Sequence, residues 1–138
     1  MFADSPCRPT IAVRDKVKAI EFYRDVLGFK LVDANQPGAS FACGGGTFLE
    51  IYPSEFAGTA KNTVAGFEVP DLEKAIIELR SRGVSFEEYE SPKTIDGIAH
   101  LGPNRGAWFK DPDGNIFALV ERGSPFSQDA PSQPVRPI

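Results

Sequence analysis

Apolar residues recur with the period of an α-helix in two separate stretches of this chain. The first stretch follows Asp15: apolar residues recur every three or four positions from Val17 until the chain reaches Gly28. In the second they recur between Asp71 and Gly83. Asp is a favoured N-terminal cap, and this spacing gathers the apolar side chains on one helix face. Each stretch therefore predicts an amphipathic helix whose apolar stripe is buried.

Short β-favouring runs surround both helices, in the same order in each half of the chain. The predicted strands are residues 10–13, 29–32, 40–43 and 47–52 in the first half, and 64–69, 85–89, 98–101 and a pair within 108–121 in the second. Each half reads as a βαβββ module, at about residues 8–53 and 64–121. Because one helix cannot cover both faces of a sheet, we expect an α+β fold in which the helices lie outside and the two sheets curl around a central cleft.

The last predicted strand, residues 116–120, is apolar at every position. A strand with one face in water should alternate apolar and polar residues, because successive side chains point to opposite faces. Both faces of this strand should therefore be covered. We expect the helix on one face, and a ligand cleft or a dimer core on the other.

Composition narrows the class of protein. The chain has 138 residues, of which 41% are hydrophobic and 25% charged, so we expect one globular domain over residues 1–122. Residues 123–138 are rich in Pro, Ser and Gln, which predicts a flexible tail.

Charge and hydropathy exclude some partners. Asp and Glu outnumber Lys and Arg by 19 to 15, without a basic run, so no nucleic-acid partner is expected. No apolar run approaches the roughly 20 residues of a membrane span, so we expect no membrane association and a cytoplasmic location. The two cysteines are too few for a disulfide framework.

Two segments carry a resemblance to a known family. AVRDKVKAIEFYRDVLGF, residues 12–29, and AWFKDPDGNIFALVE, residues 107–121, resemble the vicinal oxygen chelate superfamily. That superfamily holds glyoxalase I, extradiol dioxygenases, fosfomycin-resistance enzymes and bleomycin-resistance proteins. The resemblance covers about Arg8 to Glu121, and it implies the paired βαβββ fold and a homodimer.

The resemblance also locates the metal ligands of the metal-dependent relatives. One ligand in each half lies seven residues before the Asp that caps the helix. This chain has Arg8 and Val64 at these two positions. The other two lie on the last strand of each half, where it has Glu50 and Ala118. One carboxylate among four positions cannot hold a divalent ion, and a guanidinium would repel it. We therefore expect no metal and no cofactor at this place.

Strand alternation predicts the residues that face the cleft. The expected ligand-binding residues are Arg8, Thr10, Phe48, Glu50, Tyr52, Val64, Trp108 and Ala118. Apolar walls with sparse polar groups are typical of small-molecule sites, so we expect a metal-free protein that binds or sequesters a small aromatic or amphipathic molecule. The alternatives at single positions are an ion pair between Glu50 and Arg8, and a core position for Trp108.

An enzymatic role is the alternative function. Glu50 would act as a base, with His100 as a second catalytic group, in a metal-free lyase or isomerase of the glyoxalase kind. A dioxygenase or another enzyme with a metal site elsewhere in the chain is the remaining possibility.

Overall fold

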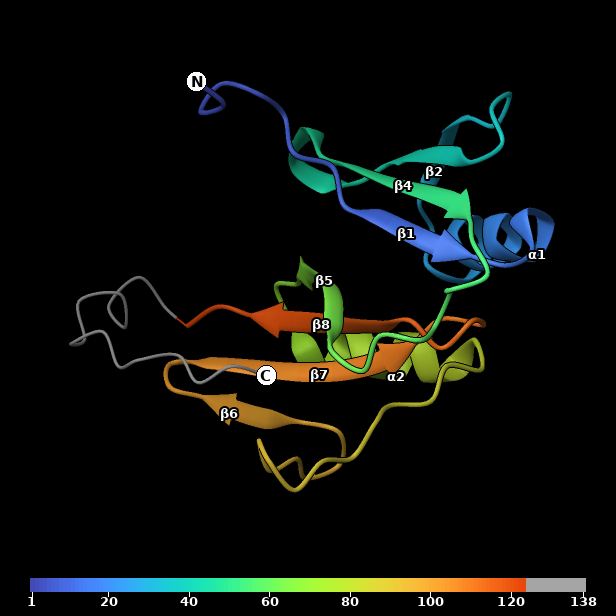
Figure 1. Cartoon of the computed structure of the whole chain (residues 1–138). Helices are drawn as coiled ribbons and strands as arrows, with labels where there is room; N and C mark the ends of the chain where they lie inside the picture. The colour runs from blue at the N-terminus through green and yellow to red at the C-terminus, as the bar shows by residue number, and fades with distance from the viewer. Residues whose placement is uncertain (124–138) are drawn as a thin grey trace. The chain divides into compact units, whose positions relative to one another are not determined.

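The computed structural model describes residues 1–123 and divides the chain into two compact units. The first comprises Met1–Thr59 with Pro112–Asn115, and the second comprises Ala60–Asp111 with the chain from Ile116 onward. Each unit holds one four-stranded sheet and one α-helix (Figure 1), which confirms the predicted α+β class. The single domain over residues 1–122 and the central cleft stay predictions. Apart from Gly123, the predicted tail lies outside the described residues.

The first unit follows the predicted order of elements. Its elements are β1 (Thr10–Val13), α1 (Lys16–Glu21), the π-helical segment η1 (Phe22–Val26), β2 (Lys30–Asp33), β3 (Ala39–Ala42), the 3-10 turn η2 (Gly44–Gly46) and β4 (Phe48–Pro53). The strands are arranged β1-β4-β3-β2, with β1 parallel to β4 and the other pairs antiparallel. Every predicted strand of this half is present within one residue of its predicted bounds.

The helix of the first unit begins as predicted, because Asp15 accepts hydrogen bonds from the backbone N–H groups of Val17 and Lys18. Ala19 and Tyr23 form its buried face, and the Tyr23 ring packs 5.6 Å from that of Phe41. The prediction that Val17 is buried is wrong, since this residue is 65% exposed. At 3.6 residues per turn, Val17 lies about 200° around the helix from Ala19, which is the opposite face.

The second unit repeats the pattern. Its elements are β5 (Thr63–Glu68), α2 (Leu72–Ser81), β6 (Ala99–Leu101), β7 (Asn104–Lys110) and β8 (Ile116–Glu121). The strand order is β5-β8-β7-β6, with β5 parallel to β8. Asp71 caps α2 by accepting from the N–H of Lys74, as predicted. None of the helices among residues 1–123 is long and apolar enough to cross a membrane.

The predicted strand at residues 85–89 is wrong. This segment makes a single bridge, Phe86 to Phe109, and one hydrogen bond from the N–H of Glu87 to the carbonyl of Trp108. The chain then turns back on itself, because Tyr89 bonds to Thr94 and leaves β7. The module remains βαβββ, since β6, β7 and β8 follow α2.

Both faces of the apolar strand β8 are covered within the second unit. Phe117, on one face, stacks against the rings of Phe67 and Phe109. The alternate residues Ile116 and Ala118 belong to a separate buried cluster. That cluster consists of Ala99, Trp108, Ile116 and Ala118, with Tyr89, Leu101 and Val120 packed against it. Side chains of its own unit thus pack on the second face of β8. A ligand cleft or a dimer core on this face stays a prediction.

Candidate functional site

A row of four polar side chains crosses the whole sheet of the first unit. Thr10 of β1 lies opposite Glu50 of β4, Glu50 opposite Ser40 of β3, and Ser40 opposite Asp33 of β2. Residues directly opposite one another in a sheet project to the same face. We call these four residues the polar row; it lies on the face of the sheet that α1 does not cover.

A β-bulge brings the fourth residue into this row. The pairing of β2 with β3 shifts between Leu31 and Asp33. Without that shift, Val32 would lie opposite Ser40, because Leu31 lies opposite Phe41. Bulges re-aim side chains in this way next to functional sites. The bulge therefore places a carboxylate in the polar row where an uninterrupted ladder would place an isopropyl group.

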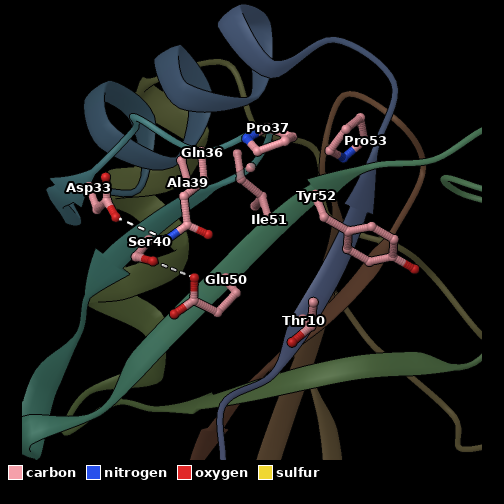
Figure 2. Close-up of a pocket in the computed structure, with 11 residues that line it drawn as sticks. Thr10, Asp33, Gln36, Pro37, Ala39, Ser40, Glu50, Ile51, Tyr52 and Pro53 are labelled. Carbon is pink, nitrogen blue, oxygen red and sulfur yellow. Dashed lines mark hydrogen bonds between the residues drawn. The ribbon is translucent and has the colours of Figure 1, made fainter.

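Glu50 is held from two sides. Its Oε1 accepts a hydrogen bond from Nη1 of Arg8 at 2.9 Å, and its Oε2 accepts one from the hydroxyl of Ser40. Figure 2 shows Ser40 pointing toward Glu50, with Thr10 on the neighbouring strand. The Glu50 side chain is 24% exposed, so the carboxylate is fixed in position while part of it still faces solvent. The ion pair with Arg8, weighed above as an alternative, is present.

Arg8 is itself held by an aromatic ring. Its guanidinium carbon lies 4.3 Å from the centroid of the Phe48 ring. A cation above an aromatic face gains about 0.5–1 kcal/mol at an exposed site. The ring and the Glu50 carboxylate together restrict a long side chain that remains 46% exposed.

A pocket of about 490 Å³ opens beside the polar row. It is lined by Thr10, Asp33, Gln36, Pro37, Gly38, Ala39, Ser40, Glu50, Ile51, Tyr52 and Pro53. Asp33 is fixed at its rim by hydrogen bonds from the N–H of Asn35 and the side-chain amide of Gln36. The Tyr52 side chain, on the same strand as Glu50 (Figure 2), belongs to a residue that is 44% exposed. The pocket thus offers carboxylates, hydroxyls and one accessible aromatic ring.

The structure brings together five of the predicted site residues and adds others. Arg8, Thr10, Phe48, Glu50 and Tyr52 lie on one face of the first sheet. Sequence reasoning missed Ser40 and Asp33. The sequence could have indicated Ser40, because counting the antiparallel register outward from the glycine turn 44–46 places this residue opposite Glu50. The sequence gives no indication of Asp33, because its place in the row depends on the bulge.

The other predicted residues belong to the second unit. Val64 lies on β5 and is partly buried, and Ala118 on β8 lies opposite Trp108. His100 is exposed on β6, opposite Arg105. Their part in a site shared with Glu50 stays a prediction.

Trp108 occupies the buried cluster of the second unit. It is 1% exposed, and its ring meets that of Tyr89 edge-on at 5.6 Å. Burial, together with the charge of Glu87, raises the pKa of the Tyr89 hydroxyl above its usual value. The indole Nε1 has no hydrogen-bond acceptor among the described residues. The core position weighed for Trp108 is the one observed, and its contact with a ligand stays a prediction.

The residues that the resemblance places at the family's metal position do not fit a divalent ion. A metal site needs three or more donor atoms, and Glu50 is the single donor among Arg8, Glu50, Val64 and Ala118. Both Glu50 oxygens accept hydrogen bonds, one of them from the guanidinium that would repel the ion.

A second acidic group lies at the start of α2. Within residues 1–123, the cluster with metal-ligand spacing is Asp71, Glu73 and Glu121. Arg105 forms ion pairs with both Glu73 and Glu121, and Glu121 also accepts from the N–H of Leu72. Hydrogen bonding to Arg105 lowers the pKa of Glu73 to about 2. This cluster joins the helix terminus to β7 and β8.

Comparison with known proteins defines the family. The family model described as the Glyoxalase/Bleomycin resistance protein/Dioxygenase superfamily matches residues 7–119. The chain belongs to this superfamily, which confirms the resemblance found in its sequence.

Individual relatives show how far the likeness extends. The uncharacterized protein YetH of Bacillus subtilis (strain 168) is 30% identical over 125 residues, which cover 80% of this chain and 92% of that protein. TnmS3, an antibiotic binding protein from Streptomyces sp. CB03234, has a TM-score of 0.68 at 26% identity, covering 89% of this chain and 99% of TnmS3. The fosfomycin resistance protein FosX of Listeria monocytogenes has the same TM-score at 15% identity, covering 91% and 98%, and so shares the fold alone.

Proposed function

We propose that this protein binds and sequesters a small aromatic or amphipathic molecule on the polar-row face of its first sheet, without a metal. The observation that carries the proposal is the double restraint of Glu50 by Arg8 and Ser40 at the edge of an open pocket. A polar group that is already fixed loses little freedom when a ligand binds. It can therefore orient a ligand at low entropic cost.

The apolar part of the ligand would contact the aromatic rings of this face. Tyr52 is 44% exposed beside Glu50, and Phe48 lies on the same strand beneath Arg8. A flat molecule stacked on such rings gains about 0.5–1.5 kcal/mol per ring pair beyond the burial of area. A pocket of about 490 Å³ lies within the size range of small-molecule sites.

The comparisons support a binding role. TnmS3, which is 26% identical to this chain over 89% of its length, is described as an antibiotic binding protein. We propose a binding role for the present chain as well. A cytoplasmic location and the homodimer that the resemblance implies also belong to the proposal.

The enzymatic alternative finds less support in the geometry. Hydrogen bonds from Arg8 and Ser40 hold both oxygens of Glu50 in place, which suits a fixed polar contact with a ligand. His100, its proposed catalytic partner, lies on β6 of the other unit. These observations favour holding a ligand over transferring its protons.

Thermal melting tests this function. The full chain would be melted with a library of flat natural products and, separately, with zinc, nickel, manganese and iron salts. A ligand present at 100 times its Kd should stabilise the folded state by about 2.7 kcal/mol, and the metals should not.

Tyr52→Ala should lose most of the ligand's effect. Phe56→Ala, which removes a more exposed ring outside the pocket, should retain it. A stabilisation that appears with a metal alone, or turnover of the bound compound, would contradict the proposal.

A further inference from the structure

Arg8 lies just before β1 and carries a permanent positive charge beside the polar row. Its Nη1 donates to Glu50, and the Phe48 ring lies against its guanidinium. Within residues 1–123, the other edge of the guanidinium, formed by Nε and Nη2, has no hydrogen-bond acceptor. The side chain is 46% exposed, so this edge is accessible to a ligand.

We propose that Arg8 is the specificity-determining residue of the binding face and that it binds an acceptor oxygen of the ligand, a carboxylate or carbonyl carried by a planar molecule. The inference rests on the proposed function and names the class of ligand. A guanidinium edge presents two parallel N–H donors, which match a carboxylate or a pair of neighbouring oxygens.

A chain of contacts holds Arg8 ready for this role. Ser40 fixes Glu50, and Glu50 together with Phe48 fixes Arg8. A free arginine side chain carries about 2 kcal/mol of rotamer entropy, part of which is already lost before the ligand arrives. The arrangement therefore favours an oxygen acceptor that needs no metal.

The competing occupant is a cation, because Asp33 and Glu50 line the pocket. Each of their four carboxylate oxygens already accepts a hydrogen bond: from Asn35 and Gln36 at Asp33, and from Arg8 and Ser40 at Glu50. Lys16 adds positive charge nearby, with its Nζ 2.6 Å from the carbonyl oxygen of Gln36. Asp33 and Glu50 are thus each stabilised by two donors of this chain, whereas the Nε and Nη2 donors of Arg8 have no acceptor among residues 1–123, so the ligand is expected to bring the acceptor.

Three probes that share one ring and differ in the charge of the head group test whether the site prefers an anionic, a neutral or a cationic ligand. Benzoate, benzamide and benzamidine would be titrated into the full chain in EDTA by isothermal calorimetry. Benzoate should bind best and benzamidine least. Arg8→Gln should weaken benzoate binding about tenfold or more, since charge-assisted hydrogen bonds are about twice as strong as neutral ones. Arg8→Lys, which keeps the charge and loses the paired donors, should also weaken it.

Arg24→Gln is the matched control. It removes one positive charge from an exposed ion pair with Asp25 in the same unit, outside the pocket, and it should leave benzoate binding unchanged. Equal losses in Arg24→Gln and Arg8→Gln would overturn the inference. A wild-type preference for benzamidine would overturn it as well, while leaving the proposed binding function in place. Failure of all three probes to bind at millimolar concentration would overturn both. Thermal melting of each variant without probe shows that the fold is retained.

Discussion

At the scale of the residue, the site depends on contacts between side chains that strand alternation brings to one face. Alternation along β1 and β4 was enough to predict Arg8, Thr10, Phe48, Glu50 and Tyr52 together. It does not predict how Glu50 is held, since that depends on a side chain of a third strand. Alternation also cannot predict burial by irregular segments, which is why the surroundings of Trp108 could not be read from the sequence.

Gly58 occupies one of the tightest positions in the first unit. It has a φ of +72°, and its N–H donates to Oδ1 of Asn115 at 3.1 Å. A Cβ at this position would lie 1.7 Å from the carbonyl oxygen of Asp113. Gly58 therefore keeps the turn Pro112–Asn115 close to the chain that follows β4.

Substitution of this glycine should be costly. Gly45 has a similar φ of +67° with nothing near its missing Cβ, so Gly45→Ala should lose about 1–2 kcal/mol of unfolding free energy from backbone strain alone. Gly58→Ala should lose about 1–3 kcal/mol more, because the added methyl group collides with backbone. Urea denaturation of both variants measures the difference. Equal losses would show that the close approach to Asp113 is absent in solution.

At the scale of the element, hydrophobic period and capping residues were good guides to strands and helices. Both helices begin after the predicted Asp caps, and eight of the nine predicted strands are present. Errors arose where a local interaction interrupts the regular pattern. Thr94 turns the 85–89 segment away from the sheet, and the bulge in β2 changes which side chain faces Ser40. Neither effect is visible in the period of apolar residues.

The ion pair between Glu73 and Arg105 at the start of α2 should make the free energy of unfolding depend on pH below about pH 5. The pKa of Glu73 is lowered to about 2 from a usual 4.5, chiefly by its hydrogen bond to Arg105. A lowered folded-state pKa stabilises the protein above the unfolded-state value, and the contribution is lost as the pH falls from about 4.5 toward 2. Because Glu73 is 52% exposed, solvent screening makes the effect small.

Urea midpoints measured from pH 7 to pH 2 test this contribution. Glu73→Gln should be less stable than the wild type above about pH 5, and the two should converge as the pH approaches 2. The difference should disappear in an Arg105→Gln background, where the partner is missing. A pH-independent difference would contradict the ion pair as its cause.

At the scale of the whole molecule, the duplicated βαβββ order places this chain in a superfamily whose fold does not specify one activity. An antibiotic binding protein and a fosfomycin resistance protein share that fold. At the four positions that the resemblance assigns to metal ligands, this chain has a cation at Arg8, a carboxylate at Glu50, and aliphatic side chains at Val64 and Ala118. Its function therefore has to be established at the polar-row face.

The most direct test is a two-dimensional ¹H–¹⁵N NMR titration of the full chain with benzoate in the presence of EDTA. If the polar-row face binds ligand without a metal, the largest amide shifts should map to Arg8, Ser40, Glu50 and Tyr52. A titration that leaves these four amides unchanged, or that moves them only after a divalent metal is added, would contradict a metal-independent site on the first sheet.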